Sequence, residues 1–241
     1  MNFKKMIEER NELVVQEYCK KNSCKKEDID VKKILENHYK NQEKLYLEEE
    51  RIKTKEENEK KRKLYAESVI NAIPPLYKTA SINDLEGEER AIAGHLYKNG
   101  GIIYSSQGGY GKTHLCFAIV RYSAEKGQKT LYMIAPKMMS IIKDNFSAEA
   151  KERKRFIESL EYSDILIIDE VDKIIGTKFE LETLFNIVNE RYNNMLITIL
   201  VGNFDDMKSV SKALGQYVIS RLLEKGYIYN MNKKNYRKSK K

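Results

Sequence analysis

A glycine-rich run at positions 106–113, SQGGYGKT, ends in a lysine and a threonine. It matches G-x-x-x-x-G-K-[ST] in its last three positions, while Ser106 stands where the first glycine of that pattern belongs. Glycines let backbone N–H groups surround a phosphate, the lysine adds a positive charge, and the threonine hydroxyl suits Mg²⁺. We therefore expect ATP and Mg²⁺ to bind a segment made of Ser106, Gln107, Gly108, Gly109, Tyr110, Gly111, Lys112, Thr113 and His114.

Two adjacent acids end an apolar run further along the chain, in ILIIDE at 165–170. An apolar run of this kind predicts a buried strand, and acids at its end can meet the phosphate-binding loop. We expect Asp169 to join Thr113 in the Mg²⁺ shell and Glu170 to polarise the attacking water. Because many phosphate-binding-loop kinases and GTPases lack the second acid, the pair favours hydrolysis.

Two further residues are candidates for the same chemistry. Asn203 follows an apolar run and Gly202, so it is expected beside the γ-phosphate, where it would orient the water. Gly-Asn is also ordinary turn chemistry, which is the alternative. Arg221 lies in VISRLL, and an arginine there is suited to stabilising charge on a transferring phosphoryl group. The alternative is a surface arginine paired with Glu224.

These residues need a scaffold, and the chain after Pro74 and Pro75 alternates short apolar runs with amphipathic ones. Such alternation predicts the α/β class, with a central parallel five-stranded sheet covered on both faces. Strands are expected at 102–105, 129–134, 164–168, 196–201 and 227–230, and helices at 87–98, 112–126, 136–145, 149–160, 178–193 and 215–225. His95 and His114 are expected to be structural, with the His114 ring turned toward its own helix.

The N-terminal region, 1–72, contains no glycine and no proline and is nearly half charged. Glu and Lys at i,i+4 over 43–68 favour a long exposed helix. We expect a small all-helical region with little core of its own, completed by a partner; a solvated spacer helix is the alternative. The expected organisation is 1–72 for this region and its connector, 73–231 for the ATP-binding domain, and 232–241 for a basic tail.

Charge and cysteine content narrow the possible classes of protein. The net charge of +8 arises mainly from the tail, because 230–241 holds six Lys or Arg and no acid. That tail can contact phosphates or remain a frayed end. No apolar run is long enough to span a membrane, and the segment MNFKKMIEER has acidic residues and no apolar core, unlike a secretory signal, so a cytoplasmic protein is expected. Cys19, Cys24 and His38 leave a weak metal pattern open, beside the alternative of reduced thiols.

The segments GYGKTHL, ILIIDE, GNF and LGQYVISRLLEKG, in this order, resemble the DnaC/DnaI family of bacterial replicative helicase loaders, with the IstB transposition ATPases as relatives. The segment IPPLYKTASINDL and the closing NYR fit as well, so the resemblance covers about 73–237. It implies an AAA+ ATPase with nucleotide bound between protomers, self-association in the ATP state, and Arg221 acting on a neighbour's ATP. Only twenty residues follow Arg221, so no helical lid is expected.

The resemblance also implies a function and DNA contacts. It favours a loader that grips a hexameric replicative helicase through the N-terminal region and binds single-stranded DNA; a transposase regulator on duplex DNA and a nucleotide-gated adaptor with little turnover remain alternatives. IIKDNF at 141–146 resembles the loader segment whose Lys and Phe face DNA, here Lys143 and Phe146. Thr177 and Phe179 resemble a second such loop, and the alternative is that both phenylalanines lie in the core. Arg191 matches a family arginine that serves either the protomer interface or a salt bridge.

Overall fold

The computed structural model describes residues 3–28, 30–144, 150–174 and 177–231. By its internal contacts the chain forms two compact units, Met1–Lys61 and Arg62–Lys241. Each unit is described separately below. Of the helices described, none is both long and apolar enough to cross a membrane.

The first unit consists of helices. α1 (Phe3–Asn22) and the short 3-10 helix η1 (Lys26–Asp28) precede α2 (Val31–Ala72), which extends past the end of this unit. Tyr39 of α2 donates a hydrogen bond to Asn11 of α1 at 2.5 Å. In the described part of this first unit, Val15 is the only buried apolar side chain, at 2% exposure, so the unit has little core.

The second unit is built on a sheet of five parallel strands, which confirms the predicted α/β class. The spatial order is β2-β3-β4-β1-β5, so β1 lies between β4 and β5 although it comes first in the chain. β1 and β3 are fully buried, and β4 between them is buried except at its two end residues, as expected for a parallel sheet with both faces covered. The strands are β1 (Gly101–Ser105), β2 (Thr130–Ile134), β3 (Ile165–Asp169), β4 (Ile197–Asn203) and β5 (Tyr227–Asn230).

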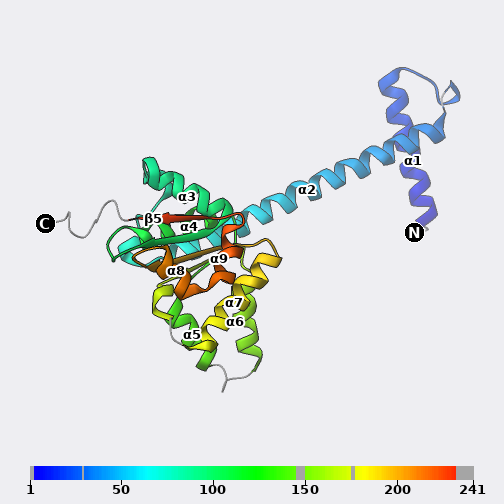
Figure 1. The fold of residues 1–241 in the computed structure, drawn as a ribbon. Helices are drawn as coiled ribbons and strands as arrows, with labels where there is room; N and C mark the ends of the chain where they lie inside the picture. Colours follow the sequence, from blue (N-terminus) through cyan, green and yellow to red (C-terminus); the bar gives the residue numbers. More distant parts are fainter. Residues whose placement is uncertain (1–2, 29, 145–149, 175–176, 232–241) are drawn as a thin grey trace. The chain divides into compact units, whose positions relative to one another are not determined.

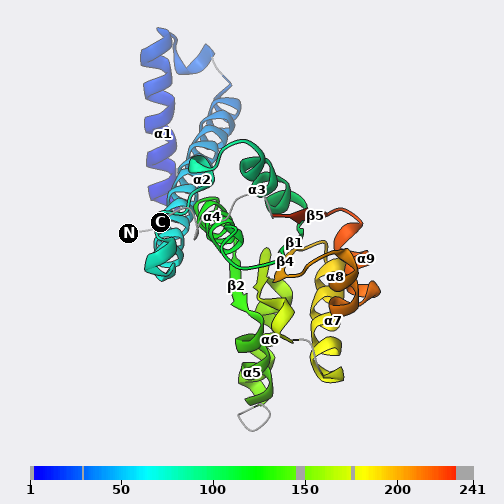
Figure 2. The same cartoon turned by 60° about the vertical axis from the view of Figure 1, so that its left-hand side comes forward.

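Alternate residues of each strand feed two separate cores, one on each face of the sheet. Ile103, Ile167 and Val201 pack with α3 (Gly87–Asn99) and α4 (Lys112–Glu125). Ile102 and Ile168 belong to the other core, whose helices are visible on the opposite side of the sheet in Figures 1 and 2. Those helices are α5 (Ala135–Asp144), α6 (Ala150–Tyr162), α7 (Lys178–Asn193), α8 (Met207–Leu214) and α9 (Gln216–Leu223).

Helix boundaries follow local signals. α7 begins with a capping box, in which the Thr177 hydroxyl accepts from the Glu180 N–H and the Glu180 carboxylate accepts from the Thr177 N–H. The sequence predicted one helix over 215–225 and missed α8 before it. Gly215, at φ 78°, separates the two, because that backbone conformation ends one helix and lets the next start in a new direction. No helix follows β5 within the described chain.

The last turns of α2 and the segment after it are packed on the second unit's own core. Arg62 donates to the Lys126 carbonyl at 2.6 Å, at the end of α4. The Tyr65 hydroxyl accepts from the Thr130 N–H at 3.1 Å, at the start of β2. Arg121 of α4 donates to the Ala80 carbonyl at 2.9 Å. The 3-10 helices η2 (Pro75–Tyr77) and η3 (Ile82–Asp84) lie within this connection.

Candidate nucleotide-binding site

The glycine-rich loop connects the carboxyl end of β1 to the first turn of α4. Gly109 and Gly111 adopt φ of 98° and 86°, which an L side chain rarely tolerates, and Gly111 is the residue that precedes α4. Ser106 is not among the residues with positive φ. The serine at the first glycine position of the pattern therefore needs no unusual backbone conformation, which explains the departure from that pattern.

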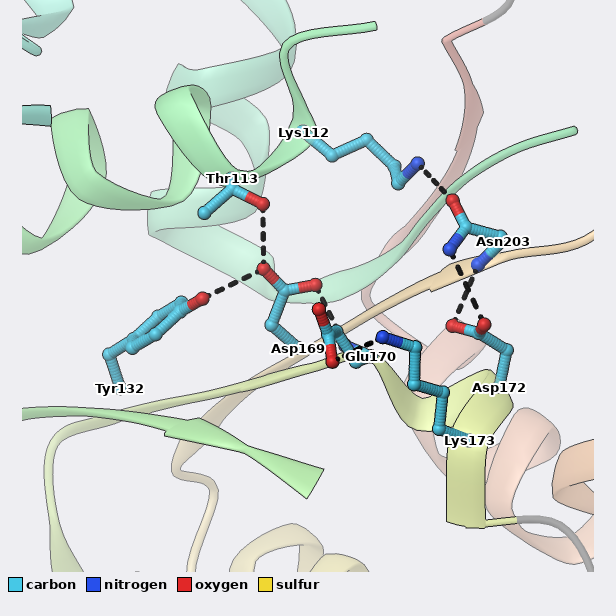
Figure 3. A network of polar contacts seen from close by, with 8 residues as sticks. All are labelled: Lys112, Thr113, Tyr132, Asp169, Glu170, Asp172, Lys173 and Asn203. Carbon is cyan, nitrogen blue, oxygen red and sulfur yellow. Dashed lines mark hydrogen bonds and ion pairs between the residues drawn. The ribbon is translucent and has the colours of Figure 1, made fainter. Parts of the chain in front are cut away.

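Lys112 begins α4, and its side chain is folded into the loop rather than toward solvent, with 8% of the residue exposed. Its Nζ donates to Asn203 Oδ1 at 2.8 Å (Figure 3). It also donates to the Gln107 carbonyl at 3.3 Å and to Ser105 Oγ. The acceptors come from β1, from the loop and from β4. Adjacent strands β1 and β4 thus bring the lysine and Asn203 together.

Asp169 closes β3 and receives three hydrogen bonds at 4% exposure. Its Oδ2 accepts from the Thr113 hydroxyl at 2.9 Å and from the Tyr132 hydroxyl at 2.8 Å, while its Oδ1 accepts from the Glu170 N–H at 2.7 Å. A threonine hydroxyl beside a strand-end aspartate is the oxygen pair that holds Mg²⁺ in phosphate-binding-loop NTPases. The donor set therefore fits a Mg²⁺–nucleotide complex.

Glu170 has φ of 59°, one of three non-glycine residues with positive φ in the described chain. Such a conformation is strained for a side-chain-bearing residue and persists only where its surroundings hold it. Here the Lys173 ammonium lies 2.7 Å from Glu170 Oε2. This contact raises the pKa of Lys173, chiefly through the hydrogen bond to Glu170. The carboxylate is thus held by its own following turn.

Asn203 closes β4 and is held from two sides. Its backbone N–H and its side-chain amide both donate to Asp172, at 2.9 and 3.3 Å, while its Oδ1 accepts from Lys112. Asp172 lies in the 3-10 helix η4 (Val171–Ile174), which follows directly on Asp169 and Glu170. Asn203 is therefore part of the polar network of the loop, which is more than the turn residue of the alternative interpretation.

Three residues of this network were missed by sequence reasoning. Tyr132 lies on β2, and its contact with Asp169 follows from the pairing of β2 with β3, which one sequence does not reveal. Burial and the neighbouring Asp169 raise the pKa of Tyr132 far above its ordinary range, so the phenol is a donor. Asp172 and Lys173 had a visible signal, since they extend the charged run that begins at Asp169.

The remaining loop residues have different surroundings. Gln107 and Gly108 are exposed, Tyr110 is half-buried against the core of α3 and α4, and His114 is half-buried on α4. His95 accepts or donates a 2.6 Å hydrogen bond with the Tyr229 hydroxyl and stacks on Tyr227. It therefore has a packing role, as predicted.

Arg221 lies near the amino ends of the strands, whereas the glycine-rich loop lies at their carboxyl ends. It lines an open pocket of about 370 Å³ together with Lys98, Asn99 and Ile197, which lie at the amino ends of β1 and β4. Its Nε donates to Asn189 at 2.6 Å and its guanidinium lies 4.9 Å from the centre of the Phe185 ring. Arg221 also donates to the Tyr217 carbonyl at 3.1 Å, while Glu224, the partner suggested above, accepts a hydrogen bond from the Tyr192 hydroxyl.

Of the residues expected to contact DNA, the three that the structure describes lie at the end of α5 and the start of α7. Lys143 Nζ lies 2.8 Å from Glu180 and 5.8 Å from the centre of the Phe179 ring. Thr177 caps α7. This ion pair and the cap hold the pKa of Glu180 below its ordinary value. Phe146 lies outside the described residues, and Phe179 is partly buried against the α5–α9 core.

Arg191 has neither of the two roles expected from the sequence, an interface residue or a salt-bridge partner. It is fully buried, at 0% exposure, and donates to Thr198 Oγ1 at 2.9 Å and to backbone carbonyls, which include those of Leu160, Ser163 and Ile197. Burial lowers its pKa to about 10. A side chain enclosed in this way cannot reach a neighbouring protomer, and these hydrogen-bond acceptors are neutral oxygens rather than a carboxylate. Arg191 joins α6, α7 and β4 within one domain.

The cysteines offer no metal centre in the described chain. Cys19, Cys24 and Cys116 are free thiols, and no group of three or more His, Cys, Asp or Glu residues is placed to hold a metal ion among the residues described. Burial raises the pKa of Cys116 well above its ordinary value, which keeps this thiol protonated.

A parallel sheet, a glycine-rich loop that leads from β1 to Lys112, and the pair Asp169–Glu170 at the end of β3, which β4 separates from β1, define a P-loop ATPase of the AAA+ type. The family described as the bacterial DnaA ATPase domain matches residues 88–226. The chain belongs to this family and carries its ATPase domain.

Individual relatives agree with this assignment. Replicative helicase loader DnaC of Escherichia coli (strain K12) is 29% identical over 120 residues, which cover 50% of this chain and 49% of that protein. DnaC of Buchnera aphidicola subsp. Baizongia pistaciae is 28% identical over 194 residues, covering 76% of this chain and 77% of that protein. The matched part of this chain thus spans about half the length of the Escherichia coli relative.

Solved structures share the fold. AMPPCP-bound DnaA from Aquifex aeolicus superposes with a TM-score of 0.57 at 19% identity, covering 68% of this chain and 52% of that one. The crystal structure of the DnaC helicase loader gives a TM-score of 0.52 at 19% identity, covering 65% of this chain and 99% of that one. At these identities the likeness concerns the fold alone.

Proposed function

We propose that this chain hydrolyses ATP and uses the cycle to load a hexameric replicative helicase onto single-stranded DNA. The observation that supports hydrolysis is the convergence of Lys112, Thr113, Asp169, Glu170 and Asn203 at the carboxyl ends of β1, β3 and β4. The loader role is supported by relatives that are named replicative helicase loaders.

Each residue has a chemical role in this proposal. The loop N–H groups and Lys112 bind the phosphates, and Glu170 accepts a proton from the attacking water while Asn203 orients that water. Thr113 and Asp169 would hold Mg²⁺, which neutralises charge on the β- and γ-phosphate oxygens when bound. The remaining loop residues, Ser106 to Tyr110, Gly111 and His114, surround the nucleotide.

Arg221 acts in trans in this proposal. Asn203 and Ile197 stand at opposite ends of β4, which is roughly 20 Å of strand at about 3.3 Å per residue. Arg221 shares its pocket with Ile197, so it is far from the phosphate loop of its own chain. An arginine so placed is suited to reach the γ-phosphate of a neighbouring protomer, which places ATP at a shared interface and couples turnover to self-association.

Other parts of the chain are assigned to the binding of partners. We propose that the helical region 1–72 binds the helicase, that 73–231 forms the ATPase, and that the basic tail 232–241 is a separate segment. Lys143, Phe146, Thr177 and Phe179 would contact single-stranded DNA. The exposed apolar side chains of Leu13, Leu45 and Ile52 support a partner-binding role for the helical region. The cytoplasm is the compartment in which such a protein would work.

A loading assay on closed DNA tests this function. The full chain is mixed with the replicative helicase of the same genome and closed circular single-stranded DNA, and helicase retained on the circle is measured with and without ATP. Loading on a closed circle requires an opened helicase ring, so retention that depends on this chain supports the proposal. A chain that neither binds the helicase nor raises its retention, but binds a transposase and duplex DNA, would establish the IstB-like alternative.

A further inference from the structure

Asp172 belongs to the polar network of the site and has no role in the hydrolysis proposed above. It lies three residues after Asp169 in η4, and both of its oxygens face Asn203: Oδ1 accepts from the Asn203 N–H at 2.9 Å and Oδ2 from the Asn203 side-chain amide at 3.3 Å (Figure 3). The same Asn203 side chain accepts from Lys112 at 2.8 Å. The Asn203 side-chain amide is therefore hydrogen-bonded to the Asp172 carboxylate on one side and to the Lys112 ammonium on the other.

These two neighbours determine which way the amide points. A carboxylate only accepts hydrogen bonds and an ammonium only donates them. The Asn203 NH₂ must therefore face Asp172, and its Oδ1 must face Lys112. A reversed amide would set oxygen against carboxylate and N–H against ammonium, losing both bonds.

The neighbouring backbone is shaped for this contact. A Cβ on Gly202 would lie 3.1 Å from Asp172 Oδ1, 3.1 Å from Val171 Cγ2 and 2.6 Å from Phe204 Cε2. Any side chain at this position would thus push against the carboxylate and the Phe204 ring. The glycine before Asn203 lets η4 approach the end of β4 closely enough for Asp172 to reach both donors.

We propose that Asp172 is a positioning residue, which acts through Asn203 to set the rate of ATP turnover. This inference rests on the proposed ATP hydrolysis at the same site. With Lys112 drawn to the phosphates, the orientation held by Asp172 leaves Asn203 Oδ1 as an acceptor facing the reaction. An acceptor can take a hydrogen bond from the attacking water, whereas it has none to give to a phosphate oxygen. Asn203 therefore acts on the water in this chain.

Asp172→Asn is the sharpest change, because it keeps the shape and one oxygen for the Asn203 N–H but replaces the other oxygen with a donor. That donor favours the reversed Asn203 amide. We expect kcat to fall about 10- to 100-fold while KM and the affinity for a fluorescent ATP analogue stay within about threefold of wild type. Asp205→Asn, an equal change of charge on the exposed loop after β4, is the matched control and should keep wild-type kcat.

A double-mutant cycle separates positioning from a general structural effect. If Asp172 acts through Asn203, the double variant Asp172→Asn/Asn203→Ala should have the kcat of Asn203→Ala alone. A kcat for Asp172→Asn within twofold of wild type, or a full multiplicative loss in the double variant, overturns the proposal. Thermal melting of each variant with the ATP analogue shows whether the fold is retained.

A second measurement does not depend on turnover. In wild type the Asn203 side-chain NH₂ protons, assigned by their loss in Asn203→Ala, should exchange with solvent more slowly than those of exposed asparagines. In Asp172→Ala this protection should disappear. Unchanged exchange overturns the positioning role even if the wild-type chain has no ATPase activity, and that inactivity would count only against the proposed hydrolysis.

Discussion

Glu170 and Lys173 face each other across one 3-10 turn, with 2.7 Å between Oε2 and Nζ. The backbone of Glu170 is in the left-handed region, at φ 59°, so its side chain leaves the strand in a direction that an extended residue would not take. The ion pair then engages the carboxylate that is proposed as the base. Both groups are partly exposed, at 38% for Glu170 and 52% for Lys173, so the pair can open.

Removal of Lys173 should speed turnover, because its ammonium competes with the attacking water for the Glu170 carboxylate. An exposed ion pair is worth at most about 1 kcal/mol, so Lys173→Met should raise kcat by no more than about fivefold. Steady-state phosphate release checks this. Lys154→Met, which opens the similar Lys154–Glu158 pair on α6, should leave kcat unchanged. A fall in kcat for Lys173→Met would mean that the lysine supports catalysis.

Loss of Lys112 should remove nucleotide binding, whereas loss of the Glu170 charge should not. Lys112→Ala removes the buried cation of the loop and should weaken ATP binding roughly 100-fold or more. Glu170→Gln should bind ATP normally and hydrolyse it about 100- to 10,000-fold more slowly. Fluorescent-nucleotide titration and phosphate release measure the two effects, with the exposed Lys137→Ala as a control. Equal hydrolysis by wild type and Glu170→Gln would exclude Glu170 as the base.

A mixture of two inactive variants tests the role of Arg221 across an interface. Arg221→Ala keeps a complete phosphate loop, and Lys112→Ala keeps the arginine, so a mixed interface has both parts intact. We expect each variant alone to be inactive and the mixture to regain part of the wild-type rate. The assay is run with single-stranded DNA present to gather protomers. Normal self-association without any regained activity would argue against action in trans.

Arg191 should be a determinant of stability. Arg191→Met leaves the carbonyls of Leu160, Ser163 and Ile197 without their buried donor, and each unsatisfied group costs about 1–3 kcal/mol. We expect the free energy of unfolding to fall by about 3 kcal/mol or more. Urea denaturation measures it, with the exposed Arg155→Met as a control that should change little. A loss below about 1 kcal/mol would show that water replaces the guanidinium.

Glu180 should weaken DNA binding if Lys143 contacts a phosphate, because the Glu180 carboxylate is ion-paired with Lys143 and competes with the phosphate for it. Glu180→Gln keeps the capping box, since glutamine serves at that position. It should strengthen ATP-dependent binding to single strands and steepen the salt dependence by about one charge. Fluorescence anisotropy over a salt series measures this, and Glu182→Gln, which alters the Lys178 pair, is the control.

The basic tail offers another explanation for any DNA binding. Deletion of 232–241 should remove only binding that needs no ATP and does not distinguish single strands from duplex. Loss of a stacked aromatic, in Phe179→Ala or Phe146→Ala, should cost about 1–3 kcal/mol of single-strand affinity. If the tail deletion removes all binding and neither aromatic variant changes it, the DNA interface at α5 and α7 is wrong.

The strands of the sheet were predictable because each is a continuous apolar run with a clear turn signal beside it. The five observed strands begin and end within about two residues of the predicted ones. α8 was missed because it has eight residues and is separated from α9 by one glycine. Its signals, a capping Asp206 at the start and Gly215 at the end, are local, so this helix was within reach of the sequence.

The polar network was predictable only where its partners share a local pattern. Lys112, Thr113 and Asp169 stand in two short motifs whose geometry is recurrent. Contacts such as Tyr132 with Asp169 arise instead from strand order and register, which depend on how the whole sheet assembles. Arg191 was not predictable for the same reason. No sequence pattern distinguishes a buried arginine that binds carbonyls from an arginine at a protomer interface.

α4 has Lys112 at its first residue and is followed by Lys126, whose carbonyl accepts from Arg62. Gly127 leaves room for the Arg62 side chain, since a Cβ there would meet Arg62 Nε at 2.5 Å. Fourteen residues at 1.5 Å each make a rod of about 21 Å between these points. One inserted residue would turn its two ends by about 100° relative to each other. The length of α4 is therefore a constraint on variation in this chain, because a change in it would disengage either the phosphate loop or Arg62.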